Sequence, residues 1–376
     1  MPLSILLIII CCKILQTVLV FLGKGMRYVL LFLFAIFFVA MINNRLKGTN
    51  AFFTDYSSPA QTTAINGIFV LLVFLSHAAQ YVRLNGVMDK PYDLLKTFLG
   101  QLVVVTFLFF SGYGMMESIR KKGKAYVKSI PGRRLFKVWY HFAIAMLFYV
   151  ILNLSLGRSF GIKTTLLAFT GWSSISNSNW YMFVTFVLYI IVFISFIVFG
   201  KSNVLAAVAV TVLTVAFAVF EYKIGLPTRF YNTIICFPAG MLFSLLKPYF
   251  DKFVLKRDLN WFVSFVIMLA VFGVTAYYNN KSVLIYSTEG IIFVILIMLF
   301  TMKVKIQNGI LNWFGKHVFS IYILQRIPME ILEHFGIAEY KYLFVAISFA
   351  ATVAFAAIFD QCTGKLDTLI YRKKKI

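Results

Sequence analysis

The sequence predicts an all-α, polytopic integral membrane protein, a helical bundle of ten core transmembrane helices preceded by one or two N-terminal ones. Three observations predict it. Of the 376 residues, 61% are hydrophobic and 13% are charged, which is about half the charged share of a soluble domain. The 42 Phe and 20 Tyr residues supply side chains suited to lipid contact and interfacial anchoring. Long apolar runs also recur along the chain. This composition excludes a soluble enzyme, a disordered protein and a nucleic-acid-binding module.

Each predicted span is a run of about 20 apolar residues, the length that crosses the hydrocarbon core of a bilayer. The first two runs are joined by only Gly23 to Met26, which indicates a hairpin. The polar stretch from Asn43 to Thr63 then separates them from a set of ten. In chain order the predicted spans are 4–22, 27–43, 64–82, 95–117, 135–153, 180–199, 203–220, 229–247, 260–278, 284–302, 312–332 and 341–360.

The basic residues predict the orientation of these spans. The chain carries 36 Lys and Arg against 13 Asp and Glu, for a net charge of +23. With the N-terminus in the cytoplasm, 23 of the 36 basic residues fall in inner loops and 11 in outer loops. Cytoplasmic loops of membrane proteins collect Lys and Arg. We therefore expect a multi-pass protein of the cell (plasma or inner) membrane with both termini in the cytoplasm.

The chain divides into three predicted parts. Residues 1–60 form an N-terminal transmembrane hairpin and a polar linker, residues 61–362 form the membrane domain, and residues 363–376 form a basic cytoplasmic tail. The four cysteines have neither the spacing of a zinc site nor that of a disulfide framework, so no metal is expected.

The loop from Glu117 to Lys137 holds eight basic residues and one acid. One interpretation is a clamp for a phosphate-bearing ligand, in which Arg133 and Arg134 are planar bidentate donors. The alternative is that the loop only orients the protein and attracts anionic headgroups. Spacing by itself favours the second interpretation.

Ionisable side chains inside a membrane span are costly, and they mark function or a paired structural role. His77 lies in the outer half of its predicted span, where it is either a general base or a core histidine bonded between helices. Glu289 lies at a comparable depth, and it either orients His77 or is an interfacial acid at a helix start. Arg326 requires a partner or a wet cavity. The remaining histidines are predicted to be interfacial: His141, His317 and His334.

Six blocks resemble, in the right order, the motifs of the acyltransferase family 3 of integral membrane proteins. Ala64-Ile-Asn-Gly-Ile-Phe-Val-Leu-Leu-Val-Phe-Leu-Ser-His77 resembles its signature helix, in which an Arg, ten residues and a His follow one another. The resemblance covers about residues 60–362. The other blocks are Phe109-Phe-Ser-Gly-Tyr-Gly114, Arg133-Arg-Leu-Phe-Lys-Val-Trp139, Asn179-Trp-Tyr-Met182, Phe237-Pro-Ala-Gly-Met241 and Phe314-Gly-Lys-His-Val-Phe-Ser-Ile-Tyr-Ile-Leu-Gln-Arg326.

The resemblance implies transfer of an acyl group, usually acetyl from acetyl-CoA, to a hydroxyl of a carbohydrate or lipid-linked glycan. It implies an acyl-CoA donor as substrate, no bound cofactor, contact with membrane lipids and no nucleic-acid partner. His77 is implied to act as base or transient acyl carrier, and Arg133 and Arg134 are implied to bind the donor. The matching positions expected to bind donor or acceptor are Asn66, Ser111, Arg133, Arg134, Lys137, Trp180, Tyr181, Gln325 and Arg326.

The sequence departs from the motifs at three positions. Asn66 replaces the signature Arg, Gln325 replaces a later His, and Lys137 replaces what is often a third Arg. Asn66 keeps a donor and an acceptor but loses the fixed charge and the bidentate fork of Arg. Two alternatives therefore stay open beside the acyltransferase: an exporter or transporter of a glycan with the same fold, and a membrane protein without activity.

Overall fold

The computed structural model describes residues 29–371, except 85, 87 and 88. The predicted span 4–22 and the basic residues 372–375 lie outside the described residues. Within the described part, helices make up almost all of the regular structure. The exception is one antiparallel pair of dipeptides, β1 (Arg45–Leu46) and β2 (Val304–Lys305).

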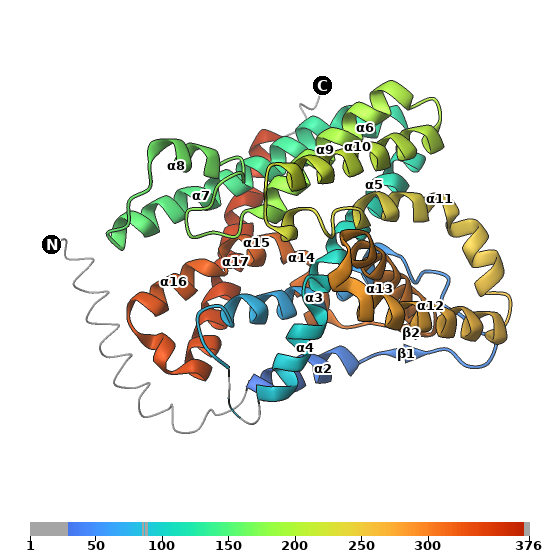
Figure 1. Cartoon of the computed structure of the whole chain (residues 1–376), viewed down its shortest axis with the longest axis horizontal. Helices are drawn as coiled ribbons and strands as arrows, with labels where there is room; N and C mark the ends of the chain where they lie inside the picture. The colour runs from blue at the N-terminus through green and yellow to red at the C-terminus, as the bar shows by residue number, and fades with distance from the viewer. Residues whose placement is uncertain (1–28, 85, 87–88, 372–376) are drawn as a thin grey trace.

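Eight helical stretches within the described residues are long and apolar enough to cross a membrane, which confirms a polytopic helical membrane protein (Figure 1). They are α3 (Pro59–Ala78), α5 (Leu102–Lys122), the stretch Lys124–Ser155, α9 (Trp180–Phe199), α10 (Asn203–Lys223), α12 (Asp258–Tyr278) with the turn to Lys281, α13 (Val283–Lys303) and α17 (Lys341–Ile370). The stretch Lys124–Ser155 joins α6 (Lys124–Ile130), the π-helical turn Pro131–Phe136 and α7 (Lys137–Ser155). The shorter helices are α2 (Val29–Met41), α4 (Lys90–Leu99) and α8 (Ile162–Ala168).

Two predicted spans have a different form in the structure. The span predicted at 229–247 is α11 (Cys236–Val254), which begins seven residues later and contains Pro248. The span predicted as one helix at 312–332 is broken at His317 and Gln325 into three helices: α14 (Gly309–Lys316), α15 (Val318–Leu324) and α16 (Arg326–His334). Non-helical backbone at membrane depth is stable where it is buried in protein or lines a cavity, and this broken helix lines the cavity described below.

Two predicted boundaries are also corrected. The helix predicted to start at 95 begins at Leu102 instead, because Gly100 has a φ of +46° and ends α4. The last helix, predicted to end at 360, continues to Ile370, so that residues 363–370 of the predicted tail are helical. Asp367 explains this extension, since it is bonded to side chains of α7.

Close helix packing in the centre of the bundle depends on glycines. α5 packs along α11, and a Cβ added at Gly112 of α5 would lie 2.0 Å from the carbonyl oxygen of Phe237. α3 packs along α14 in the same way, and a Cβ at Gly67 would lie 2.0 Å from the carbonyl oxygen of Leu311. Small residues let membrane helices approach this closely.

Gly112→Ala is expected to destabilise the protein, because the added methyl group would push α5 away from α11. Overpacking of this kind costs about 1–3 kcal/mol, which should lower the melting temperature in detergent by several degrees. Gly114→Ala is the matched control, since a Cβ at Gly114 of the same helix meets nothing within 4 Å. Equal melting temperatures for the two variants would contradict this packing.

The ion pairs agree with the predicted sides of the membrane. Six of the eight ion pairs among the described residues join two segments that the sequence places on the same side, and the other two lie within α5 and α11. Lys305 bonds Asp55 and Lys303 bonds Asp258 at the predicted inner side, each at 2.5 Å. At the predicted outer side Arg158 bonds Glu330. These pairs support the alternation of the helices, whereas the choice of the cytoplasmic side rests on the charge of the loops.

Candidate functional site

A cavity of about 810 Å³ lies among α3, α5, α7, α9, α14, α15 and α17. Its wall includes residues near the predicted inner ends of these helices and residues well toward their predicted outer ends. Five of the residues expected to bind donor or acceptor line it: Asn66, Ser111, Arg134, Lys137 and Tyr181. Helices that are far apart in the sequence thus bring these five motif positions together around one cavity.

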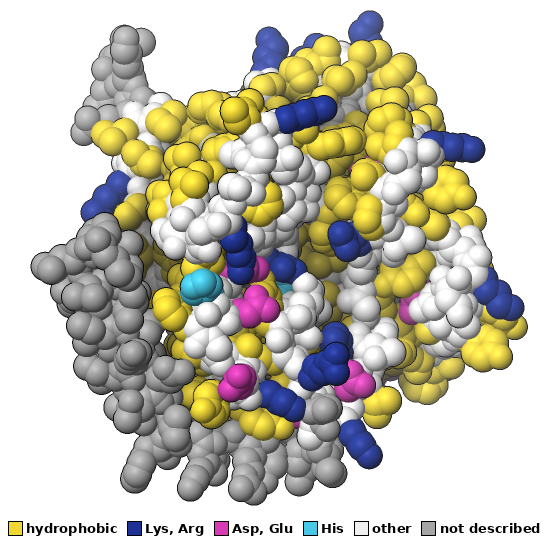
Figure 2. Space-filling view, turned by 60° about the vertical axis from the view of Figure 1, so that its left-hand side comes forward, with side chains coloured by type: hydrophobic (Ala, Val, Ile, Leu, Met, Phe, Trp, Pro, Cys, Tyr) yellow, Lys and Arg dark blue, Asp and Glu magenta, His cyan; other side chains and the backbone are white. Residues whose placement is uncertain are grey.

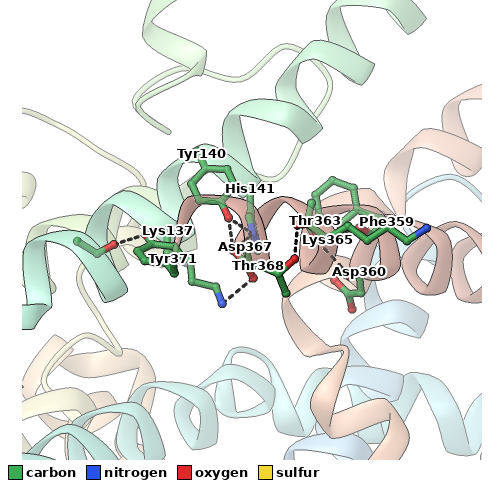
Figure 3. A network of polar contacts seen from close by, with 11 residues as sticks. Lys137, Tyr140, His141, Phe359, Asp360, Thr363, Lys365, Asp367, Thr368 and Tyr371 are labelled. Atoms are coloured by element: carbon green, nitrogen blue, oxygen red, sulfur yellow. Dashed lines mark hydrogen bonds and ion pairs between the residues drawn. The ribbon is translucent and has the colours of Figure 1, made fainter. Parts of the chain in front are cut away.

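At the inner end of the cavity, α7 and α17 are joined through Asp367. Its carboxylate accepts from Lys137 Nζ at 2.7 Å and lies 3.1 Å from His141 Nε2, and Tyr140 also donates to it (Figure 3). Lys137, predicted only as a donor-binding residue, is therefore also a structural cation, and His141 is part of the cavity wall and not a lone interfacial residue.

A second carboxylate of α17 lies two helical turns earlier on the same face. Asp360 accepts from Ser320 Oγ at 2.7 Å and bonds Nδ1 of His317, the residue at which the broken helix is interrupted. Both Asp360 and His317 line the cavity. The cavity wall therefore holds fixed positive and negative groups, and the cations most available to a ligand's phosphates are those without a carboxylate partner.

The opposite end of the cavity is aromatic. Tyr181 and Tyr322 line it, and their ring centroids lie 5.4 Å apart. Tyr322 is 6% exposed, and its hydroxyl has no hydrogen-bond partner among the described residues. The ring of Tyr322 is also 6.1 Å from that of His77. One aromatic ring therefore separates the cavity from His77.

His77, near the C-terminal end of α3, is bonded through Nδ1. Arg326 Nε lies 3.3 Å from this nitrogen and Ser178 Oγ lies 3.2 Å from it. Arg has no acceptor atoms, so Nδ1 must accept, and a neutral ring then carries its proton on Nε2. The half-buried His77 is consequently held in one tautomer beside a fixed positive charge, and its Nδ1 acceptor is shared by Arg326 Nε and the Ser178 hydroxyl.

A second layer of polar groups supports Arg326. Its Nη1 donates to Tyr81 Oη at 3.2 Å, and Tyr81 in turn donates to Glu330 Oε1 at 2.6 Å. Burial raises the pKa of the Tyr81 phenol, which keeps it a neutral donor. Glu330 is 7% exposed and bonds Arg158 Nη1 at 2.5 Å, a bond that raises the pKa of the Arg158 guanidinium. Acidic and basic side chains also gather at the centre of the face seen in Figure 2.

Among the described residues Glu289 makes no bond to His77, so the geometry lends no support to the interpretation in which this carboxylate orients the imidazole. Glu289 is buried on α13, and its Oε2 accepts from Asn279 at 3.0 Å. Its helix is packed mainly against α12 and α5. Within the described chain, the charged group that contacts His77 is Arg326.

Three more predicted residues lie off the cavity wall. Arg133 is exposed on the π-helical turn, next to Arg134, which does line the cavity. Trp180 is 9% exposed and packs on Phe230. Gln325 is buried at the break between α15 and α16, where its Nε2 donates to the carbonyl of Tyr322.

The two remaining cavity residues present polar atoms to it. The Oδ1 of Asn66 has no hydrogen-bond partner among the described residues, and the Ser111 hydroxyl lies 3.4 Å from that of Tyr189. An amide oxygen left without a partner is costly inside a protein, so Asn66 is available to a ligand.

The motifs did not single out Ser178, Tyr81, Glu330 or Arg158. Three of these are loop or helix-end residues whose partners are 148 to 249 positions away in sequence. Of these four residues, Glu330 is the one that the sequence could predict to lie near Arg326, since it lies four residues later and hence on the same face of a helix.

A family model described as an acyltransferase domain matches residues 63–360, which is most of the chain. No curated protein and no solved structure matches the sequence. The matched range begins in α3, ends in α17 and contains every residue of the cavity and of the His77 cluster except Thr62, Thr363, Gly364 and Asp367. This chain therefore belongs to the acyltransferase family 3 of membrane proteins.

Proposed function

We propose that the protein is an O-acyltransferase that moves an acyl group, acetyl in the first instance, from cytoplasmic acyl-CoA to a hydroxyl of a cell-surface or lipid-linked glycan. Membership of the family implies acyl transfer. The observation that carries the proposal is the cavity, which leads from a basic end to an aromatic end one ring away from His77.

The charges of the cavity support a phosphate-bearing donor at the inner end. Arg134 lines the cavity and donates from Nε to Tyr126 Oη at 3.1 Å, which leaves its terminal nitrogens for a phosphate. Lys137 is shared with Asp367. The nucleotide part of acyl-CoA would lie against this basic end, with both termini of the protein on the same, cytoplasmic side.

The dimensions support delivery of the acyl group toward His77. Asn66 and His77 are eleven residues apart on one helix, which corresponds to about 16 Å along its axis. An extended pantetheine arm covers such a distance, and the aromatic walls at Tyr181 and Tyr322 exclude water from a thioester. The acceptor would approach from the outer side, where the polar cluster around Arg326 and Glu330 lies.

The function is tested with membranes that contain the protein, its endogenous glycan and radiolabelled acetyl-CoA. We expect label to enter the glycan as an ester that mild alkali releases. Glycan that accumulates inside cells lacking the protein, with its acyl content intact, would instead identify an exporter. Absence of both effects would fit a membrane protein without activity.

Arg134→Ala is expected to raise the KM for acetyl-CoA about tenfold and to change kcat much less, because it removes a charge-assisted contact made to the donor both before and during transfer. Arg133→Ala is the matched control, since this neighbouring arginine does not line the cavity. Steady-state rates at varied acetyl-CoA measure both constants. Equal KM values for the two variants would contradict this donor site.

A further inference from the structure

Ser178 lies in a loop whose backbone is fixed on both sides. Asn153 of α7 donates to the carbonyl of Ile175 at 3.0 Å and accepts from Ser176 Oγ at 3.0 Å. Asn179 donates to the carbonyl of Gly171 at 2.8 Å. Ser176 has a φ of +73°, a left-handed conformation that a residue other than glycine adopts only when its surroundings hold it there. The position of the Ser178 hydroxyl is therefore set by the fold.

The surroundings of Ser178 are those of an activated hydroxyl. Its Oγ lies 3.2 Å from His77 Nδ1, the nitrogen that must be an acceptor, and it receives a hydrogen bond from Arg326 Nε at 2.8 Å. A nucleophile and its base lie within hydrogen-bond reach in this way in enzymes that form covalent intermediates. Ser178 also directly precedes the N-cap of the 20-residue helix α9, whose N-terminus favours negative charge.

We propose that Ser178 is a catalytic nucleophile that carries the acyl group as an ester between the donor and the acceptor, with His77 as its base. This inference rests on the proposed acyl transfer. The wall formed by Tyr181 and Tyr322 separates the donor cavity from the polar cluster on the outer side. Ser178 is three residues from Tyr181, at this boundary, so a small acyl group crosses the boundary while the large thiol carrier stays in the cavity.

Both steps balance without a further reactant. In the first, Ser178 Oγ bonds the acyl carbonyl carbon, its proton goes to His77 Nδ1, the carbon–sulfur bond breaks and the thiolate takes that proton. In the second, the acceptor hydroxyl gives its proton to His77 Nδ1 and its oxygen bonds the same carbon. The carbon–Oγ bond then breaks and Oγ recovers the proton. Arg326 stabilises the negative charge that develops in each step.

The test uses the purified full chain and radiolabelled acetyl-CoA without acceptor, followed by acid quenching and mass spectrometry. We expect wild-type protein to retain label on the peptide that contains Ser178. Ser178→Ala should lose this label and lower transfer to glycan in membranes about a thousandfold. Ser178→Cys should retain label as a thioester that neutral hydroxylamine cleaves, which a merely structural hydroxyl would not do. Ser174→Ala, in the same loop, is the matched control.

Several results would overturn the relay. They are transfer by Ser178→Ala at the wild-type rate, label that maps to His77 instead of Ser178, and transfer by wild-type protein that never carries label. A Ser178→Ala variant that is inactive only because it misfolds would show a lowered melting temperature and would not bind acetyl-CoA. The Ser178→Cys variant then decides: hydroxylamine-sensitive label on it supports the relay, and its absence contradicts the relay. Failure of wild-type protein to transfer acetyl to glycan at all would contradict the proposed function itself.

Discussion

His77→Ala is expected to lower kcat for acyl transfer by a factor of about 10² to 10⁴, which is the contribution of a general base to a rate. The variant removes the Nδ1 acceptor that faces Ser178 and Arg326. His77→Asn is the more informative companion, since its amide oxygen still accepts hydrogen bonds from those neighbours but cannot relay a proton. We expect it to fold as the wild type does and to be equally inactive.

The measurement is the rate of label transfer from acetyl-CoA to glycan in membranes that hold equal amounts of each variant. His334→Ala is the control, because that histidine is exposed at the end of α16. Wild-type rates in both His77 variants would show that His77 takes no part in acyl transfer. An inactive His77→Ala beside an active His77→Asn would give it a structural role only.

Much of the fold is predictable from sequence because an apolar run of membrane-spanning length is a local property. The eight long helices fall within or close to predicted spans for this reason. The interruptions at His317 and Gln325 are different, since a largely apolar run with scattered polar residues is predicted as one helix. The break at His317 lies where the helices leave a cavity and where Asp360 bonds His317, neither of which the local sequence records.

The candidate site divides in the same way. Asn66, Ser111, Arg134, Lys137 and Tyr181 were found from motifs, and they do line one cavity. The sequence does not predict Arg326 as the partner of His77, because Glu289, an acid at similar depth, is the candidate for the orienting group. Similar depth along two helices does not fix which side chains face one another, and the carboxylate of Glu289 on α13 bonds Asn279.

The Arg beside His77 changes the chemistry that the motif suggested. A carboxylate partner would have stabilised a protonated imidazole, whereas a guanidinium opposes it and favours a neutral ring with Nδ1 free to accept. The ring is therefore neutral at rest, which is the state in which a general base can accept a proton from a nearby hydroxyl. Gln325, which replaces the later His of the motif, is uncharged, so Arg326 supplies the positive charge beside His77 in this protein.

Glu330→Gln is expected to weaken both stability and activity. Glu330 is 7% exposed and bonds Tyr81 and Arg158, and Tyr81 carries its influence to Arg326. Loss of one member of a fully buried ion pair costs about 3–5 kcal/mol. The Arg158 side chain is 37% exposed, so we expect about 2 kcal/mol here, together with at least a tenfold loss of kcat as Arg326 loses its fixed position.

The distinctive result is expected in the double variant. Glu330→Gln leaves the cation Arg158 without its carboxylate partner, whereas Glu330→Gln with Arg158→Gln removes that cation as well. The melting temperature should therefore recover in the double variant, while kcat stays low because the contact from Glu330 through Tyr81 to Arg326 is still altered. Glu333→Gln, an exposed acid on the same helix, is the control and should change neither. Recovery of kcat together with stability would show that Glu330 only balances charge and does not position Arg326 for transfer.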